Sequence, residues 1–415
     1  MKLLLCVIFL TLPLQALDYI EYLSLEDDQK EKLIKKYVKS KGGLNTIRLK
    51  AYSLYGDVSK AELFHMAVMM EDFYKQFKKQ FKGSFKSRQT PQLYLMQNYS
   101  SMARAYAKWV SPAQGSIPGW AAGLFSSYGS KRALFGNAEH GEQTISVMKH
   151  EGTHQLLDAY LGSKVPTWFN EGTADVFETF EMDRSMENNL ALNLHASSHP
   201  GYALNRFPGK RIPFADLVQL DGRKWSAATG DRVTIQYMSS WVAVHYMLTN
   251  KKGLAIYQKL LQAIKGGKFS PKKMFSSASL NSIENALKKH EEEVILPHAK
   301  HVGAIETHRE KGLTDQMLQL ASAYEKEYPE NLEADFYVIF STLLNRKSDS
   351  EGAGSYSKDL ASLEKKGYRH PEIDYALAMA FQQEGNLSKA KRYLRQMLAN
   401  APRHEPSLEL QEKLK

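Results

Sequence analysis

The sequence predicts an α+β protein in which a small mixed sheet with helices precedes a region of helices alone. Strand-forming runs alternate with helical patterns up to about residue 135, whereas the chain beyond residue 303 shows helical periodicity without strands. With 415 residues, 43% of them hydrophobic, the chain can build two or three domains with substantial cores. We expect a sheet-containing domain over residues 47–300 and an α-helical domain over residues 303–415.

Residues 1–16, MKLLLCVIFLTLPLQA, have the character of a secretory signal peptide. A basic start precedes an apolar run from Leu3 to Leu14, and Ala16 is the small residue after which cleavage is expected. The run is too short to span a bilayer, and no other stretch approaches that length. Cys6 is the only cysteine, so the mature chain would hold no disulfide. These features predict a periplasmic or extracellular protein without a transmembrane segment.

The first elements alternate between helix and strand. Residues 17–46 are expected to form a helical lead-in that ends at Gly42-Gly43. Residues 47–55 are rich in strand formers, and Ser59 with Glu62 matches a capping box that opens the next helix. The further elements expected here are a strand over 92–97, a helix over 100–109, and a hairpin of 120–125 with 131–135.

The central motif of the chain is His150-Glu151-Gly152-Thr153-His154. On a helix, His150 and His154 lie one turn apart on the same face and can hold one zinc ion. Glu151 then projects beside the metal, where its carboxylate can accept a proton from the attacking water. The alternative interpretation of such a motif is an amphipathic helix with two solvated histidines.

A second motif, Asn170-Glu171-Gly172, follows on what should be the next helix. A hydrolytic zinc site needs three protein ligands and an open position, and Glu171 is the candidate for the third ligand. Gly162 and Pro166 are expected to end the first helix and to let the second return across the site. Asp175, one turn after Glu171, is placed to accept the other ring N–H of a zinc-bound histidine. This layout favours the zinc interpretation.

These residues resemble the gluzincin metallopeptidases, in which the third zinc ligand is a glutamate on the helix after the HExxH helix. The string PTWFNEGTADVFE is similar to the bacterial peptidase-MA-like proteins of that clan. The resemblance implies a zincin-like catalytic domain with zinc ligands His150, His154 and Glu171 and the base Glu151. Asn170 and Asp175 also match the thermolysin-type arrangement, although the linker before Glu171 is shorter than in thermolysin-like enzymes.

The same resemblance implies two further features. In gluzincins an edge strand next to the site pairs with extended substrate, and residues 131–135 are the candidate, with an ordinary interior strand as the alternative. A tyrosine from a downstream helix donates to the oxyanion in several gluzincins. Tyr237, on a helix predicted over 233–249, lies a similar number of residues downstream of the candidate ligand Glu171. The alternative is a core tyrosine, and His245 is a weaker candidate donor.

Helices over 256–264 and 281–294 are expected to complete the domain, with a boundary near Pro297. Between the candidate site and these helices, His195 and His199 have a spacing that suits a second metal only on a helix. The proline and glycine that follow His199 favour a loop instead.

Residues 374–402 resemble a tetratricopeptide (TPR) repeat. Small or apolar residues and a terminal proline occupy the positions that the repeat requires: Leu377, Ala378, Phe381, Ala390, Leu394 and Pro402. Residues 314–329 fit the end of an earlier unit. Such TPR-like helices either cap the catalytic domain or hold a protein partner.

The formal charge of +10 favours acidic surfaces in a general way. Lysines from Lys30 to Lys86 are interleaved with aromatic residues at helical spacing, which is typical of a buried helix face opposite a solvated basic face. We therefore expect no nucleic-acid partner. Attraction to anionic cell-envelope polymers is left open.

Taken together, the motifs favour a secreted zinc metallopeptidase acting on a peptide or protein substrate. Two alternatives stay open: a non-catalytic zinc-containing scaffold that binds a partner through its C-terminal helices, and a zinc amidase acting on cell-wall amides. Glu151 weighs against the scaffold, which needs no general base. Endopeptidase and exopeptidase are not distinguished, although Glu139 or Glu142 could bind an amino terminus.

Overall fold

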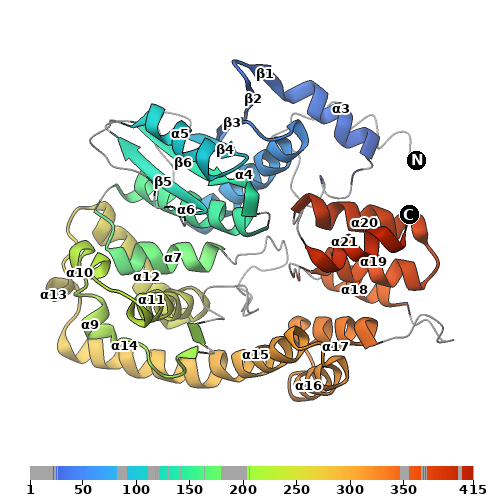
Figure 1. Cartoon of the computed structure of the whole chain (residues 1–415). Coiled ribbons are helices and arrows are strands. Elements are labelled where there is room, and N and C mark those ends of the chain that lie inside the picture. The colour runs from blue at the N-terminus through green and yellow to red at the C-terminus, as the bar shows by residue number, and fades with distance from the viewer. Residues whose placement is uncertain are drawn as a thin grey trace. The chain divides into compact units, whose positions relative to one another are not determined.

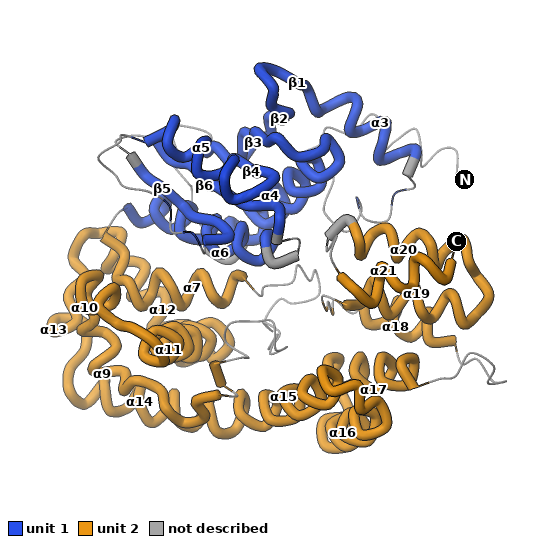
Figure 2. Tube along the Cα trace, in the orientation of Figure 1, with its two compact units in different colours: residues 1–162, 399–402 blue, residues 163–398, 403–415 orange. Residues whose placement is uncertain are grey.

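The computed structural model describes residues 22, 25, 27–81, 91–110, 117, 119, 121–128, 131–140, 142–162, 164–178, 203–204, 206–345, 355–365, 368, 370, 372–400 and 404–414. The chain divides into two compact units, residues 1–162 with 399–402 and residues 163–398 with 403–415 (Figure 2). The expected signal peptide, His195, His199 and Pro402 lie outside the described residues. None of the helices in the described ranges is both long enough and apolar enough to cross a membrane.

The first unit is built on a six-stranded mixed sheet with the strand order β1-β2-β3-β4-β6-β5 (Figure 1). Its strands are β1 (Lys39–Lys41), β2 (Leu44–Arg48), β3 (Ser53–Gly56), β4 (Gln92–Met96), β5 (Gly123–Tyr128) and β6 (Lys131–Asn137). The neighbours β3, β4 and β6 are parallel, whereas β1, β2 and β5 join through antiparallel pairs. The α+β class predicted from the sequence is confirmed.

The lead-in to this sheet is helical only in part. Helix α3 (Asp27–Tyr37) is followed by the hairpin of β1 and β2 rather than by more helix. Gly42 and Gly43 form its two-residue turn with φ angles of 61° and 81°. A two-residue hairpin turn of this kind needs positive φ at both central residues, which glycine adopts without steric cost. The two glycines therefore form the turn of a hairpin and do not end a helix. The single strand expected over 47–55 is divided between β2 and β3.

Both faces of the sheet are covered by helices of the same unit. On one face, α5 (Tyr99–Trp109) packs on β4 and β6 through a buried cluster that includes Met102, Trp109 and Phe135. On the other face lie α4 (Lys60–Phe81) and α6 (Glu142–Leu161). The predicted capping box of α4 is confirmed, since the Ser59 N–H donates to Glu62 and the Glu62 N–H donates to the Ser59 hydroxyl, at 2.9 and 3.2 Å.

The prediction that residues 131–135 form an edge strand is wrong. These residues lie in β6, which pairs with β4 on one side and β5 on the other. The physical reason is burial: residues 133–137 are all buried, because both edges of β6 are hydrogen-bonded and both of its faces are covered. The edge strand of the sheet next to β6 is β5.

The described part of the second unit is helical throughout. Its helices are α7 (Thr167–Glu178), α9 (Phe214–Leu217), α10 (Gly222–Ser226), α11 (Asp231–Thr249), α12 (Lys251–Lys265), α13 (Pro271–Met274), α14 (Ser277–His290), the π-helical turn η4 (Glu291–Ile295), α15 (Leu296–Glu310), α16 (Thr314–Glu327), α17 (Leu332–Asn345), α18 (Tyr356–Lys365), α19 (Ile373–Gln383), α20 (Leu387–Asn400) and α21 (Glu405–Lys413). The helices expected over 233–249 and 256–264 are confirmed. The one expected over 281–294 is α14 with η4, and Pro297 stands in the first turn of α15, where a helix tolerates proline.

Within this unit α7 packs closely against α11. A Cβ on Gly172 would lie 2.4 Å from the backbone oxygen of Ser240, so only glycine allows the two helices this approach. Around that contact, Trp168 packs edge-to-face on Phe214, and Phe169 packs on Tyr257 at 5.2 Å between ring centroids. Helix α7 is therefore held in place by neighbours on two sides.

Among the C-terminal helices, α16 packs on α15 and α17, and α19 packs on α17 and α18. Helices α19 and α20 meet at Gly385, whose φ of 75° suits the residue just after a helix end. The predicted helical character of residues 374–400 is confirmed. Their assignment as a tetratricopeptide repeat stays a prediction.

Candidate metal centre

The helix that carries the HExxH motif follows the interior strand β6 after the short 3-10 turn η3 (Ala138–His140). The Asn137 side chain accepts a hydrogen bond from the Glu139 N–H at 3.1 Å, and the Asn137 carbonyl accepts one from the Thr144 hydroxyl at 2.6 Å. Asn137 is fully buried, so these bonds fix the start of α6 to the end of β6. At the other end Gly162, with a φ of 82°, stops the helix as expected.

Small residues set the position of α6 on the sheet. The Met148 side chain fills the space over Gly123 of β5 and Gly136 of β6, where added Cβ atoms would lie 2.6 and 2.8 Å from it. One turn further along the same side of α6, a Cβ on Gly152 would lie 3.0 Å from Met70 and 3.3 Å from Phe73, both on α4. The glycine inside the motif therefore lets α6 pack closely against α4, its neighbour on the same face of the sheet.

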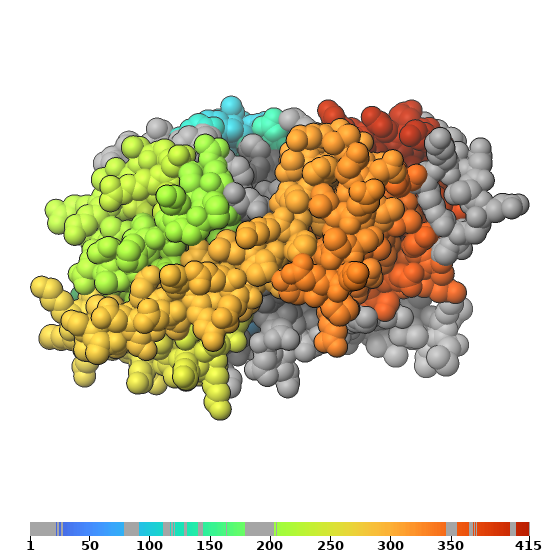
Figure 3. All heavy atoms as spheres, turned by 90° about the horizontal axis from the view of Figure 1, so that it is seen from below, coloured from blue at the N-terminus to red at the C-terminus, as the bar shows by residue number. Residues whose placement is uncertain are grey.

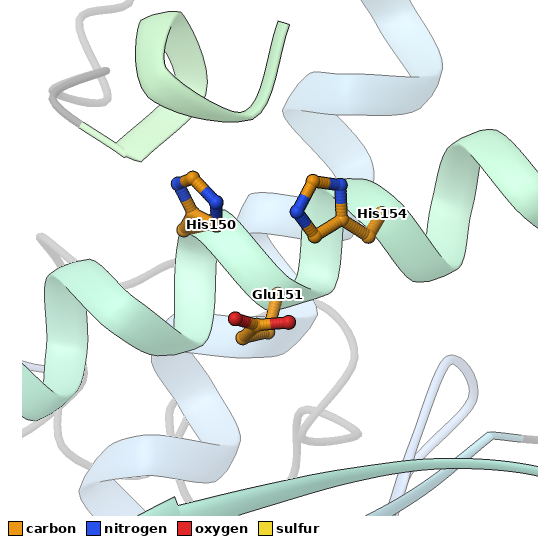
Figure 4. Close-up of side chains that lie close together, drawn as sticks. All are labelled: His150, Glu151 and His154. Atoms are coloured by element: carbon orange, nitrogen blue, oxygen red, sulfur yellow. The ribbon is translucent and has the colours of Figure 1, made fainter. Parts of the chain in front are cut away.

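The two histidines of the motif lie side by side. Their ring centroids are 4.8 Å apart and their planes are nearly perpendicular, at 88°. One potential ligand atom from each of His150, Glu151 and His154 lies within 4.8 Å of the others, and all three side chains are half-buried. Figure 4 shows both rings on one side of α6 and the Glu151 carboxylate beside the same helix. This group could hold a metal ion.

The Glu151 carboxylate is oriented by the edge strand. Its Oε2 accepts a hydrogen bond from the backbone N–H of Phe125 in β5, at 2.6 Å. Bonds from an N–H to an ionised acceptor are short and about twice as strong as neutral ones. The sequence gives no sign of this donor, because a backbone N–H is common to every residue except proline.

An ion pair joins the same helix to β6. Arg132 Nε donates to Asp158 Oδ2, with 34% of the arginine side chain and 14% of the aspartate side chain exposed. Asp158 stands one turn after His154, so this pair restrains rotation of α6 about its axis. The sequence analysis did not single out either residue.

The second motif lies on α7, in the second unit. Asn170, Glu171 and Asp175 are all on this helix, as expected; Asp175 is only 1% exposed, and Glu171 is half-buried. Glu178, which the sequence analysis missed, stands seven residues after Glu171 and so shares a face with Glu171 and Asp175. The i, i+4, i+7 spacing of the three carboxylates is the signal that could have identified it. The histidine pair belongs to the first unit, and the convergence of Glu171 on it stays a prediction.

The two candidate oxyanion donors lie on α11 in different surroundings. Tyr237 is half-buried and packs edge-to-face on Trp225, with 5.3 Å between ring centroids. His245 is buried, and its Nδ1 lies 2.9 Å from Nε2 of His290. Burial lowers the pKa of His290 to about 4, so the His290 imidazole is neutral at neutral pH. His245 is thus engaged inside the helical core, whereas the role of Tyr237 stays a prediction.

Comparison of the chain with models of protein families, with curated proteins and with solved structures found no match.

Proposed function

We propose that this protein is a zinc metallopeptidase of gluzincin type. The observation that carries the proposal is the group on α6, in which two imidazoles and a carboxylate offer ligand atoms within 4.8 Å of one another. A helix with two solvated histidines would not need a carboxylate between them, oriented by a separate strand. Hydrolysis by a metal site needs such a carboxylate as a general base.

The third zinc ligand in this proposal is Glu171. A hydrolytic zinc site typically combines two or three histidines with at most one carboxylate and keeps one position open. Helix α7 follows α6 after a short connection, and Glu171 stands in its first half, next to the glycine that packs on α11. Asp175, buried one turn later on the same face, is suited to accept a ring N–H from a ligating histidine.

A zinc ion held in this way would lower the pKa of a bound water to about 7 and polarise the carbonyl of the scissile bond. Glu151 takes the proton of the attacking water on its carboxylate and passes it to the leaving amine. Because Oε2 accepts the Phe125 N–H, the other carboxylate oxygen, Oε1, is the one that handles the proton. Tyr237 is the proposed donor to the oxyanion.

The proposed substrate is an extended segment of peptide that adds to β5. The Phe125 N–H donates to Glu151, so it points away from β6, and by the two-residue period of a strand the backbone groups of Gly123 and Ser127 share this direction. A peptide in extended conformation could pair with the groups of Gly123 or of Ser127, on one side of the Phe125–Glu151 bond, by strand addition. Such pairing would place a peptide bond next to the general base.

The test is the variant Glu151→Gln, compared with the wild type for metal content and for cleavage of a peptide library. We expect the variant to keep one zinc ion per chain and to lose hydrolysis, because glutamine keeps the shape and the hydrogen bond to Phe125 but cannot accept the proton. Glu310→Gln, which changes an exposed glutamate at the end of α15, serves as the control and should cleave like the wild type. Cleavage by Glu151→Gln at the wild-type rate would refute the proposal, as would a purified wild-type protein without bound metal.

A further inference from the structure

One stretch of the second unit has a high density of positive charge. Residues 250–290 contain nine lysines, no arginine and a single carboxylate, Glu284, for a net charge of +8. Glu284 is itself neutralised, because Arg211 donates to it at 2.5 Å and the Phe214 N–H donates to it at 2.6 Å. This stretch, a tenth of the chain, is therefore a local source of positive field.

Helix α12 displays its lysines on one side. The buried residues Tyr257, Leu260 and Ile264 define the face that packs into the unit. The lysines of the helix and the small or amide residues between them lie on the opposite, exposed face: Lys251, Lys252, Ala255, Gln258, Lys259, Gln262 and Lys265. No acidic residue interrupts this face.

The chain after α12 extends the same basic character. Gly267, with a φ of 64°, turns the chain, and the exposed Lys268 follows. Phe269 is half-buried, and the short helix α13 then exposes Lys272 and Lys273. Figure 3 shows the yellow atoms of this part of the chain at the molecular surface.

Among the described residues, several lysines of the stretch 250–290 form no ion pair with a carboxylate. Within the described ranges, no ion pair involves Lys251, Lys252, Lys259, Lys268, Lys272 or Lys273, which together we call the lysine face. By contrast, Lys288 and Lys289 lie 3.9 and 3.7 Å from glutamates one turn further along their helix. Like charges held together without counter-charges destabilise a folded surface unless an anionic partner neutralises them.

We infer that the lysine face binds the surface of a membrane that contains anionic lipid. Lysine is a compact, hydrated point charge, and clusters of it attract an anionic bilayer without specific hydrogen-bond geometry. Base-specific recognition often uses the bidentate guanidinium of arginine, and single-strand binding uses exposed aromatic rings on which bases stack. Here arginine is absent from the stretch, and Tyr257 and Phe275 are buried.

The apolar face of α12 is part of the core, so this helix lies on the headgroups and does not insert. Phe269, beside Lys268, is the residue placed to contact the boundary between headgroups and acyl chains. The binding is therefore mainly electrostatic and should weaken with rising salt.

The experiment is sedimentation of the full chain with vesicles of phosphatidylcholine, with and without phosphatidylglycerol. The wild type should sediment only with the vesicles that contain phosphatidylglycerol, and less so in high salt. Each lysine near an anionic surface changes the partition coefficient about fivefold, so the triple variant Lys259→Gln, Lys268→Gln, Lys272→Gln should lower it by about a hundredfold.

The matched control is Lys300→Gln, Lys311→Gln, Lys326→Gln, which removes the same charge from exposed lysines of α15, α16 and the turn between them. The control should bind almost as the wild type does, and circular dichroism checks that both variants are folded. If both triple variants lost the same affinity for anionic vesicles, the binding would depend only on net charge, and the inference would be overturned. Equal affinity for vesicles with and without phosphatidylglycerol would overturn it, and so would binding to duplex DNA that is stronger than binding to anionic vesicles and depends on the same lysines.

Discussion

The close approach of Gly172 in α7 to the backbone of α11 gives a sharp test of how α7 is positioned. The change is Gly172→Ala. The added Cβ would lie 2.4 Å from the Ser240 oxygen, 2.6 Å from the Ser240 carbonyl carbon and 2.9 Å from Val244 Cγ2. Two of these three atoms belong to the backbone of α11 and cannot rotate away, so the two helices must separate.

Two opposing effects determine the magnitude. Alanine is a better helix former than glycine, by about 1 kcal/mol in a helix interior. Overpacking a well-packed core costs about 1 to 3 kcal/mol, and a clash with backbone falls at the upper end of that range. We therefore expect Gly172→Ala to lower the free energy of unfolding of the metal-free protein by about 2 kcal/mol.

The assay is urea unfolding followed by circular dichroism, in the presence of a chelator so that zinc does not contribute. Gly222→Ala is the control, because the nearest atom to its Cβ would be Thr167 Oγ1, at an ordinary 3.7 Å. Gly222→Ala should leave stability unchanged or raise it. If Gly172→Ala were as stable as the wild type, the close approach of α7 to α11 would not constrain the helix that carries Glu171.

Three further predictions concern the proposed site and the core. Glu171→Gln should abolish zinc retention on dialysis, whereas Glu178→Gln should keep one zinc ion per chain; metal analysis showing the reverse would assign the third ligand to Glu178. A double-mutant cycle with Arg132→Met and Asp158→Asn, measured by urea unfolding, should give a coupling energy of about 1 kcal/mol or less, because the pair is partly exposed. A coupling energy of zero would show that the pair does not restrain α6. Burial lowers the pKa of His290 to about 4, below the 6.5 of an unfolded chain, so the unfolded state binds more protons between these values. The contribution of His290 to the free energy of unfolding should therefore be complete above about pH 6.5 and should fall as the pH drops towards 4. In unfolding measured at several pH values, His290→Gln should flatten this dependence on pH. An unchanged slope would contradict the assignment.

Local features of the fold could be predicted from the sequence. The capping box at Ser59 and Glu62 and the helix end at Gly162 depend on residues within one turn of each other, and both are as expected. The side-by-side placement of His150 and His154 follows from the helical period alone. Patterns with a short range in sequence are sufficient for such features.

Features that depend on distant pairing were not predictable. Whether β5 or β6 forms the edge is decided by which of them pairs with β4, and hydrophobicity does not distinguish two strands of one hairpin. The donor to Glu151 is a backbone group 26 residues away, with no side-chain signature. The need for glycine at position 172 likewise comes from a carbonyl on another helix.

The bond between Phe125 and Glu151 also bears on solubility. An edge strand with a continuous row of unpaired N–H groups is a template on which other chains can assemble into larger sheets. A carboxylate that occupies one of the outward N–H groups in the middle of β5 interrupts this row, so a second copy of the strand cannot extend across it without breaking a charge-assisted bond. The side chain proposed to move the proton would then also protect the folded protein from self-association whenever no peptide is bound.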